Sequence, residues 1–136
     1  MQSDLNVTVI DASVLLTALA NDNIQGRETR SLIRNQNLVA PELLDLEILA
    51  VLRRLVSSGQ LNEPRANLAM KSLAALPLER FSHVSLLPRC WELRHNLTIY
   101  DASYVALAER LGATLFTSDA RLSRSSGIRC QVRLIA

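Results

Sequence analysis

The chain has 136 residues, of which 49% are hydrophobic and 21% are charged, and its formal net charge is +2. This length and composition predict a single domain over residues 1–136 with its own hydrophobic core, and they exclude a disordered chain. A net charge of +2 does not by itself indicate a nucleic-acid partner.

Short apolar runs alternate with longer helical segments along the chain. In chain order we expect a strand at Val7–Ile10, a helix at Ser13–Ala20, a strand at Leu38–Ala40, a helix at Pro41–Ser57, a helix at Asn62–Ala75, a strand at Arg80–Leu86, a helix at Pro88–Asn96, a helix at Asp101–Leu111, a strand at Thr114–Thr117, a helix at Ala120–Ser125 and a strand at Gln131–Ile135. This order predicts an α/β fold, in which helices cover both faces of the sheet.

Three aspartates follow strands or begin helices of this pattern. Asp11 comes directly after the first strand, Asp119 follows the strand at Thr114–Thr117 with one residue between, and Asp101 begins a helix. Because ligands bind at the carboxyl ends of the strands in open α/β sheets, these side chains are expected to share one edge. Each aspartate also has a structural explanation, because acids at these positions cap helices.

Glu47 has no such explanation. In a helix its neighbours three and four positions away include Leu43, Leu44, Ala50 and Val51, so the carboxylate lies on an apolar face. One alternative is an edge position from which the side chain reaches water. The other is a nearby cation, since crowded carboxylates repel one another and take up protons. Mg²⁺ or Mn²⁺, which prefer oxygen ligands, would resolve the crowding.

Other kinds of site are not indicated. Cys90 and Cys130 lie far apart and form neither a zinc motif nor a disulfide framework, so both are expected to be free thiols. The chain contains no nucleophile elbow, phosphate-binding loop or dinucleotide fingerprint. Trp91 is expected to be a packing anchor. Neither a signal peptide nor a membrane span is visible, which predicts a soluble cytoplasmic protein.

Four segments together resemble the PIN-domain family, and their order and the chain length resemble its VapC-type toxins. The segments are Val-Ile-Asp-Ala-Ser ending at Ser13, Leu-Asp-Leu-Glu-Ile-Leu-Ala around Glu47, Ile-Tyr-Asp-Ala-Ser-Tyr-Val-Ala-Leu-Ala-Glu around Asp101, and Leu-Phe-Thr-Ser-Asp-Ala-Arg-Leu around Asp119. The resemblance covers essentially the whole chain. It implies a three-layer α/β/α sandwich around a mainly parallel sheet.

The resemblance also implies a divalent-metal-dependent endoribonuclease with an acidic quartet at Asp11, Glu47, Asp101 and Asp119. These four would be the catalytic residues and would hold Mg²⁺ or Mn²⁺. Ser13 and Thr117 fall where small hydroxyls support such a site. Some relatives carry a further acid soon after the fourth, but residues 120–123 here are Ala, Arg, Leu and Ser. Whether one metal ion or two bind is therefore left open.

The expected partners follow from the same resemblance: an RNA substrate, a small cognate antitoxin and a second copy of the chain in a homodimer. The helices at Pro41–Ser57 and Asn62–Ala75 are candidate docking or dimer surfaces, with plain core burial as the alternative. Arg121 either contacts substrate phosphate or forms a surface ion pair. Of the 15 basic residues 14 are arginines, which suits phosphate binding but also fits a codon bias.

Two alternative functions are also considered. One is a PIN-domain nuclease that processes RNA without an antitoxin. The other is a phospho-receiver-like regulatory domain, which would need a lysine near the final strand. The only lysine, Lys71, lies in a helix in the middle of the chain and disfavours the second alternative.

Overall fold

The structure, a computed structural model, describes residues 7–135 of the chain. The predicted single domain also includes residues 1–6 and 136, which lie outside the described residues. The strands are β1 (Val7–Ile10), β2 (Asn37–Pro41), β3 (Glu79–Phe81), β4 (Thr114–Thr117) and β5 (Val132–Leu134). The helices are α1 (Ala12–Ala20), α2 (Ile24–Ile33), α3 (Leu43–Ser57), α4 (Glu63–Ala75), α5 (Leu87–Glu92), α6 (Ile99–Leu111) and α7 (Ala120–Ser123), with a 3₁₀ turn at Val84–Leu86.

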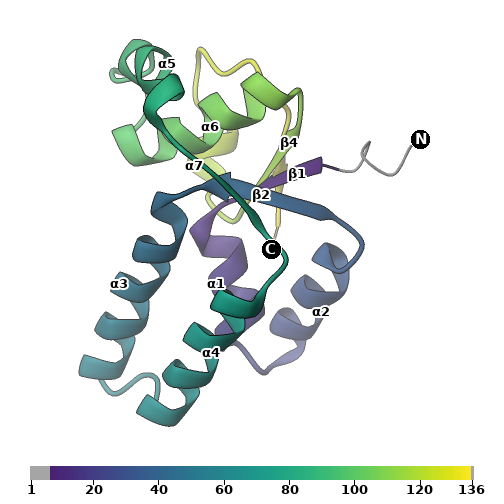
Figure 1. Cartoon of the computed structure of the whole chain (residues 1–136), viewed down its shortest axis with the longest axis vertical. Helices are drawn as coiled ribbons and strands as arrows, with labels where there is room; N and C mark the ends of the chain where they lie inside the picture. The colour runs from purple at the N-terminus through teal and green to yellow at the C-terminus, as the bar shows by residue number, and fades with distance from the viewer. Residues whose placement is uncertain (1–6, 136) are drawn as a thin grey trace.

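The five strands form one sheet in the order β3-β2-β1-β4-β5, and every neighbouring pair is parallel. The first strand lies at the centre, so the chain proceeds outward from it first through β2 and later through β4. In Figure 1, α1, α2, α3 and α4 gather on one side of the sheet, whereas α5 and α6 lie on the other. The predicted α/β/α sandwich is therefore confirmed.

The core lies on both faces of the central strands. Val9, Ile10 and Leu115 are completely buried, as expected for parallel strands that are covered by helices on both sides. Helix α6 is buried along seven consecutive residues, 102–108, and packs on β1, β2 and β4. This burial fixes the middle of α6, directly after Asp101, against the sheet.

The boundaries differ from the prediction near the second strand. Pro41 is the last residue of β2 and does not open the next helix, which begins at Leu43. Glu47 consequently lies just over one turn into α3, closer to the sheet edge than a helix beginning at Pro41 would place it. The predicted strand at Arg80–Leu86 is shorter than expected, because only its beginning joins β3.

The structure differs from the sequence analysis at one helix and at one aromatic side chain. The sequence pattern did not indicate α2, which is polar along most of its length and contains Gly26. Trp91 does not pack in the core, because 62% of its surface is exposed and the Arg94 guanidinium lies 4.4 Å from its ring centre. Two helix ends are well capped: the Asn62 side chain accepts from the Arg65 amide at the start of α4, and Gly112 ends α6 with a φ of 63°.

Candidate active site

The predicted site lies where β1 and β4 end side by side. The Asp11 amide donates to the Phe116 carbonyl at 3.1 Å, which joins the end of β1 to β4. Asp119 follows β4 after one intervening residue, so both aspartates leave the same sheet edge. Because β1 is flanked by β2 on one side and β4 on the other, this edge is the topological switch point where α/β proteins bind ligands.

Asp11 is both the cap of α1 and a member of the acidic group. Its Oδ1 accepts from the Val14 amide at 3.1 Å and from the Ser13 hydroxyl at 2.6 Å. The side chain is buried, and this burial raises the pKa of Asp11 above its usual value although the hydrogen bonds act to lower it. The negative charge of Asp101 raises it further.

The two hydroxyl residues expected beside the acids lie between the strand ends. Ser13 donates to Asp11 and accepts from the Ser118 amide at 3.1 Å. Thr117 is fully buried and accepts from the Asp119 amide at 3.0 Å, and its hydroxyl acts to lower the pKa of Asp11 against the larger effect of burial. Together these bonds tie the start of α1 to the turn after β4.

Glu47 reaches the site from α3. It is half-buried, and the Tyr104 hydroxyl donates to its Oε1 at 2.5 Å. Burial raises the pKa of Glu47, and the charges of Asp101 and Asp11 raise it further, against the lowering effect of the Tyr104 bond. Glu47 therefore lies within electrostatic range of Asp11 and Asp101. The sequence did not indicate a role for Tyr104, although its position three residues after Asp101 was a usable signal.

Asp101 lies in the first turn of α6. The Thr98 hydroxyl caps this helix by accepting from the Asp101 amide at 3.1 Å. Burial and the charge of Asp119 raise the pKa of Asp101, opposed by Thr98 and Arg121. The carboxylate is therefore within electrostatic range of acids from three other segments.

Asp119 differs from the other three because it has a cationic partner. Arg121 forms an ion pair with it at 3.1 Å, and this contact lowers the pKa of Asp119. The Arg121 side chain is 84% exposed, so little packing holds it in this position. The surface ion pair considered for Arg121 is thus present.

The donor set fits a hard divalent cation in its chemistry. Burial raises the pKa values of Asp11, Glu47 and Asp101. The charge of Asp101 further raises the pKa values of Asp11 and Glu47, and a cation between these carboxylates would remove this repulsion. Within residues 7–135, however, no three Asp, Glu, His or Cys side chains are already arranged to hold a metal ion. Bonds to Ser13, Tyr104 and Arg121 hold three of the carboxylates in this structure, so completing a coordination shell requires side-chain rotation or bound water.

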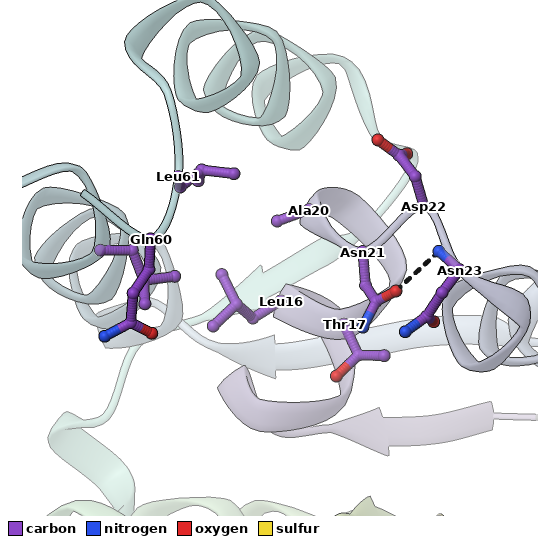
Figure 2. Close-up of a pocket in the computed structure, with 9 residues that line it drawn as sticks. Leu16, Thr17, Ala20, Asn21, Asp22, Asn23, Gln60 and Leu61 are labelled. Carbon is purple, nitrogen blue, oxygen red and sulfur yellow. Dashed lines mark hydrogen bonds between the residues drawn. The ribbon is translucent and has the colours of Figure 1, made fainter. Parts of the chain in front are cut away.

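A separate pocket lies at the far end of α1. It has a volume of about 440 Å³ and lies between the end of α1 and the turn that joins α3 to α4. Figure 2 shows Leu16 and Leu61 on its two sides, with the Asn23 amide donating to the Asn21 side chain at its rim. The pocket contains none of the predicted site residues.

Comparisons with known proteins agree with the fold. The family model described as "PIN domain" matches residues 8–127. Ribonuclease VapC1 of Mycobacterium tuberculosis is 39% identical over 128 residues, which cover 93% of this chain and 96% of that protein.

Two solved structures share the fold. The sarcin-ricin-loop-cleaving toxin VapC20 of M. tuberculosis aligns with a TM-score of 0.68 at 15% identity, over 90% of this chain and 96% of that one. VapBC2 of Rickettsia felis, bound to a DNA fragment from its promoter, aligns with a TM-score of 0.61 at 16% identity, over 93% of this chain and 98% of that one. None of the described helices is long and apolar enough to cross a membrane.

Proposed function

Because the chain belongs to the PIN-domain family, we propose that it is a VapC-type toxin, a divalent-metal-dependent endoribonuclease that hydrolyses RNA phosphodiester bonds. The observation that carries this proposal is the group of acids at the switch point of the sheet. Asp11, Glu47, Asp101 and Asp119 come from four separate segments and act on one another's pKa values in a linked series. A fold gains nothing in stability from such mutual repulsion, so a function explains it better.

The residues divide into ligands and supports. Asp11, Glu47 and Asp101 would hold the metal ion, and Asp119 would join them once its carboxylate turns from Arg121. A bound ion would lower the pKa of a water molecule and neutralise charge on the scissile phosphate. Ser13 and Thr117 orient Asp11 and the turn that carries Asp119, and the buried ends of β1 and β4 keep these groups fixed.

Arg121 has a second role in this proposal. Its exposed guanidinium neutralises Asp119 in the metal-free protein, and a metal ion would take over that task. The released guanidinium would then be free to contact a phosphate of the RNA, since arginine binds phosphate with two parallel hydrogen bonds.

An RNA-cleavage assay tests the function. Purified protein is incubated with labelled RNA in Mg²⁺, in Mn²⁺ and in chelator, beside Asp101→Asn and the control Glu79→Gln, which changes an exposed acid on β3. We expect cleavage only with added metal, a loss of about a hundredfold or more in Asp101→Asn, and wild-type rates in the control. Cleavage that persists in chelator, or at full rate in Asp101→Asn, would contradict the proposal.

We propose Mg²⁺ as the physiological ion, because all four donors are carboxylates and a site of this kind leaves room for water and substrate phosphate. The chemistry also accommodates Mn²⁺. Titrating cleavage against each ion at physiological concentrations decides between them: half-maximal activity near 1 mM Mg²⁺ would support the assignment, and activity with Mn²⁺ alone would overturn it.

We further propose that the protein acts in the cytoplasm with a small antitoxin and as a homodimer. Apolar side chains that face outward on α3 and α4 support a protein partner: Leu46, Leu49, Leu68 and Met70 are each at least 39% exposed. Light scattering of the purified chain is expected to give twice the mass of 15.1 kDa. Expression of the wild-type protein is expected to arrest growth of the host. Co-expression of the antitoxin, sought as a small open reading frame directly upstream of the gene, is expected to relieve this arrest.

A further inference from the structure

The Glu47 side chain is held at its tip by one buried hydroxyl. The Tyr104 hydroxyl donates to Oε1 of Glu47 at 2.5 Å, across 57 residues of sequence and from α6 to α3. A glutamate side chain has three rotatable bonds, and restricting them costs about 1.5–2 kcal/mol of conformational entropy. A carboxylate that must meet a cation at a fixed place therefore benefits from an anchor.

Tyr104 is well placed to be this anchor. Its side chain is only 2% exposed, so the ring is fixed by the core. It follows Asp101 by three residues in α6, which puts both side chains on the same face of the helix. Helix α6 thus presents a ligand and the hydroxyl that holds Glu47 from one rigid surface.

We propose that Tyr104 is a positioning residue, which holds Oε1 of Glu47 by a hydrogen bond and so leaves the other carboxylate oxygen directed toward the metal ion. This inference rests on the proposed function, because it assigns Tyr104 to the same metal site. Tyr104 does not touch the substrate in this account and acts only through Glu47.

A purely structural role for the contact does not explain why the partner of the Tyr104 hydroxyl is a carboxylate. A buried phenol needs a hydrogen-bond partner, but a backbone carbonyl or a neutral side chain satisfies it without removing a charge from water. Here the partner is a half-buried carboxylate that also lies within electrostatic range of Asp11 and Asp101. The bond therefore matters more for the orientation of the Glu47 carboxylate than for satisfying the Tyr104 hydroxyl.

The test is Mn²⁺ binding without RNA, measured by calorimetry at one fixed pH. Tyr104→Phe keeps the ring and removes the hydroxyl, and Tyr100→Phe is the matched control because Tyr100 is an exposed tyrosine in the first turn of α6. We expect Tyr104→Phe to bind Mn²⁺ about tenfold more weakly, as is typical for partners of metal ligands, and Tyr100→Phe to match the wild type. In a Glu47→Gln background, Tyr104→Phe is expected to cause no further loss.

A second variant separates positioning from packing. With 4-aminophenylalanine at position 104 the ring and a para donor are both retained, so this protein is expected to recover most of the lost Mn²⁺ affinity even if Tyr104→Phe folds poorly. Equal Mn²⁺ affinity in folded Tyr104→Phe and wild type would overturn the inference, as would a full additional loss in the Glu47→Gln background. A wild-type protein that binds no Mn²⁺ would instead overturn the proposed metal site itself.

Discussion

Removing the charge of Glu47 is expected to stabilise the metal-free protein while it abolishes activity. Glu47→Gln keeps a carbonyl oxygen that can accept from Tyr104 but removes a half-buried charge that faces two other carboxylates. Full burial of an unpaired charge costs several kcal/mol, and Glu47 is only half-buried and has one hydrogen bond, so we expect a gain of about 1 kcal/mol. For 136 residues, an unfolding entropy of about 2.1 cal/mol/K per residue converts this gain into about 3.5 °C of melting temperature.

The size of the stabilisation by Glu47→Gln depends on pH. The pKa of Glu47 is raised in the folded protein from its usual value of 4.5, so the ionised side chain destabilises the fold above the raised pKa. As the pH falls below 4.5, Glu47 is protonated in both the folded and unfolded states and the penalty disappears. The melting temperatures of Glu47→Gln and wild type are therefore expected to converge on acidification.

Differential scanning calorimetry in chelator measures this difference, at pH 7.5 and at pH 4, beside the exposed control Glu79→Gln. Adding Mg²⁺ is expected to reverse the order at pH 7.5, because only the wild type retains the full ligand set. A Glu47→Gln variant that melts at or below the wild-type temperature in chelator at pH 7.5 would refute the idea that this carboxylate is crowded.

Three further predictions concern the scaffold. Gly26→Ala is expected to lower the free energy of unfolding, measured in urea, by more than about 2 kcal/mol, because the new Cβ would lie 1.8 Å from the Asn21 carbonyl oxygen. A loss below about 0.5 kcal/mol would show that the connection from α1 to α2 adapts freely. Glu109→Gln is expected to lower stability at pH 7 by about 1–2 kcal/mol, since Glu109 accepts from Arg89 at 2.7 and 3.1 Å. Burial raises the pKa of Glu109, but Arg89 and the Arg129 amide together lower it more. The stabilisation is therefore present above the usual pKa of 4.5 and is lost at lower pH. A difference in melting temperature that does not change with pH would argue against the ion pair. Asn62→Ala removes the cap of α4 and is expected to cost about 1 kcal/mol in urea unfolding, whereas an unchanged midpoint would assign the cap no energetic role.

The sequence predicted the sheet and the acidic edge because their signals are local. Val7–Ile10 and Thr114–Thr117 are β-branched or apolar runs with the bounds of β1 and β4, and an acid follows each. Helix α6 was equally clear, since an acid stands in its first turn and Gly112 ends it. The strand order placed these acids together, which the carboxyl-edge rule for α/β sheets anticipated.

The features that the sequence missed depend on tertiary contacts. Helix α2 has few apolar residues, and its Gly26 is explained only by the Asn21 carbonyl that packs against it. Tyr104 belongs to an apolar helix pattern that predicts core burial, and its bond to Glu47 comes from a residue 57 positions away. The sequence did anticipate a surface ion pair as one of two roles for Arg121, and the structure shows that its partner is Asp119.

Anomalous diffraction from crystals soaked in Mn²⁺ is the most direct test of the central claim, which is that four carboxylates at one sheet edge form a metal site. We expect an anomalous peak within bonding distance of carboxylate oxygens of Asp11, Glu47 or Asp101, with Asp119 turned away from Arg121, and no such peak in Asp101→Asn. A wild-type crystal that binds Mn²⁺ only elsewhere, or not at all at millimolar concentration, would contradict it.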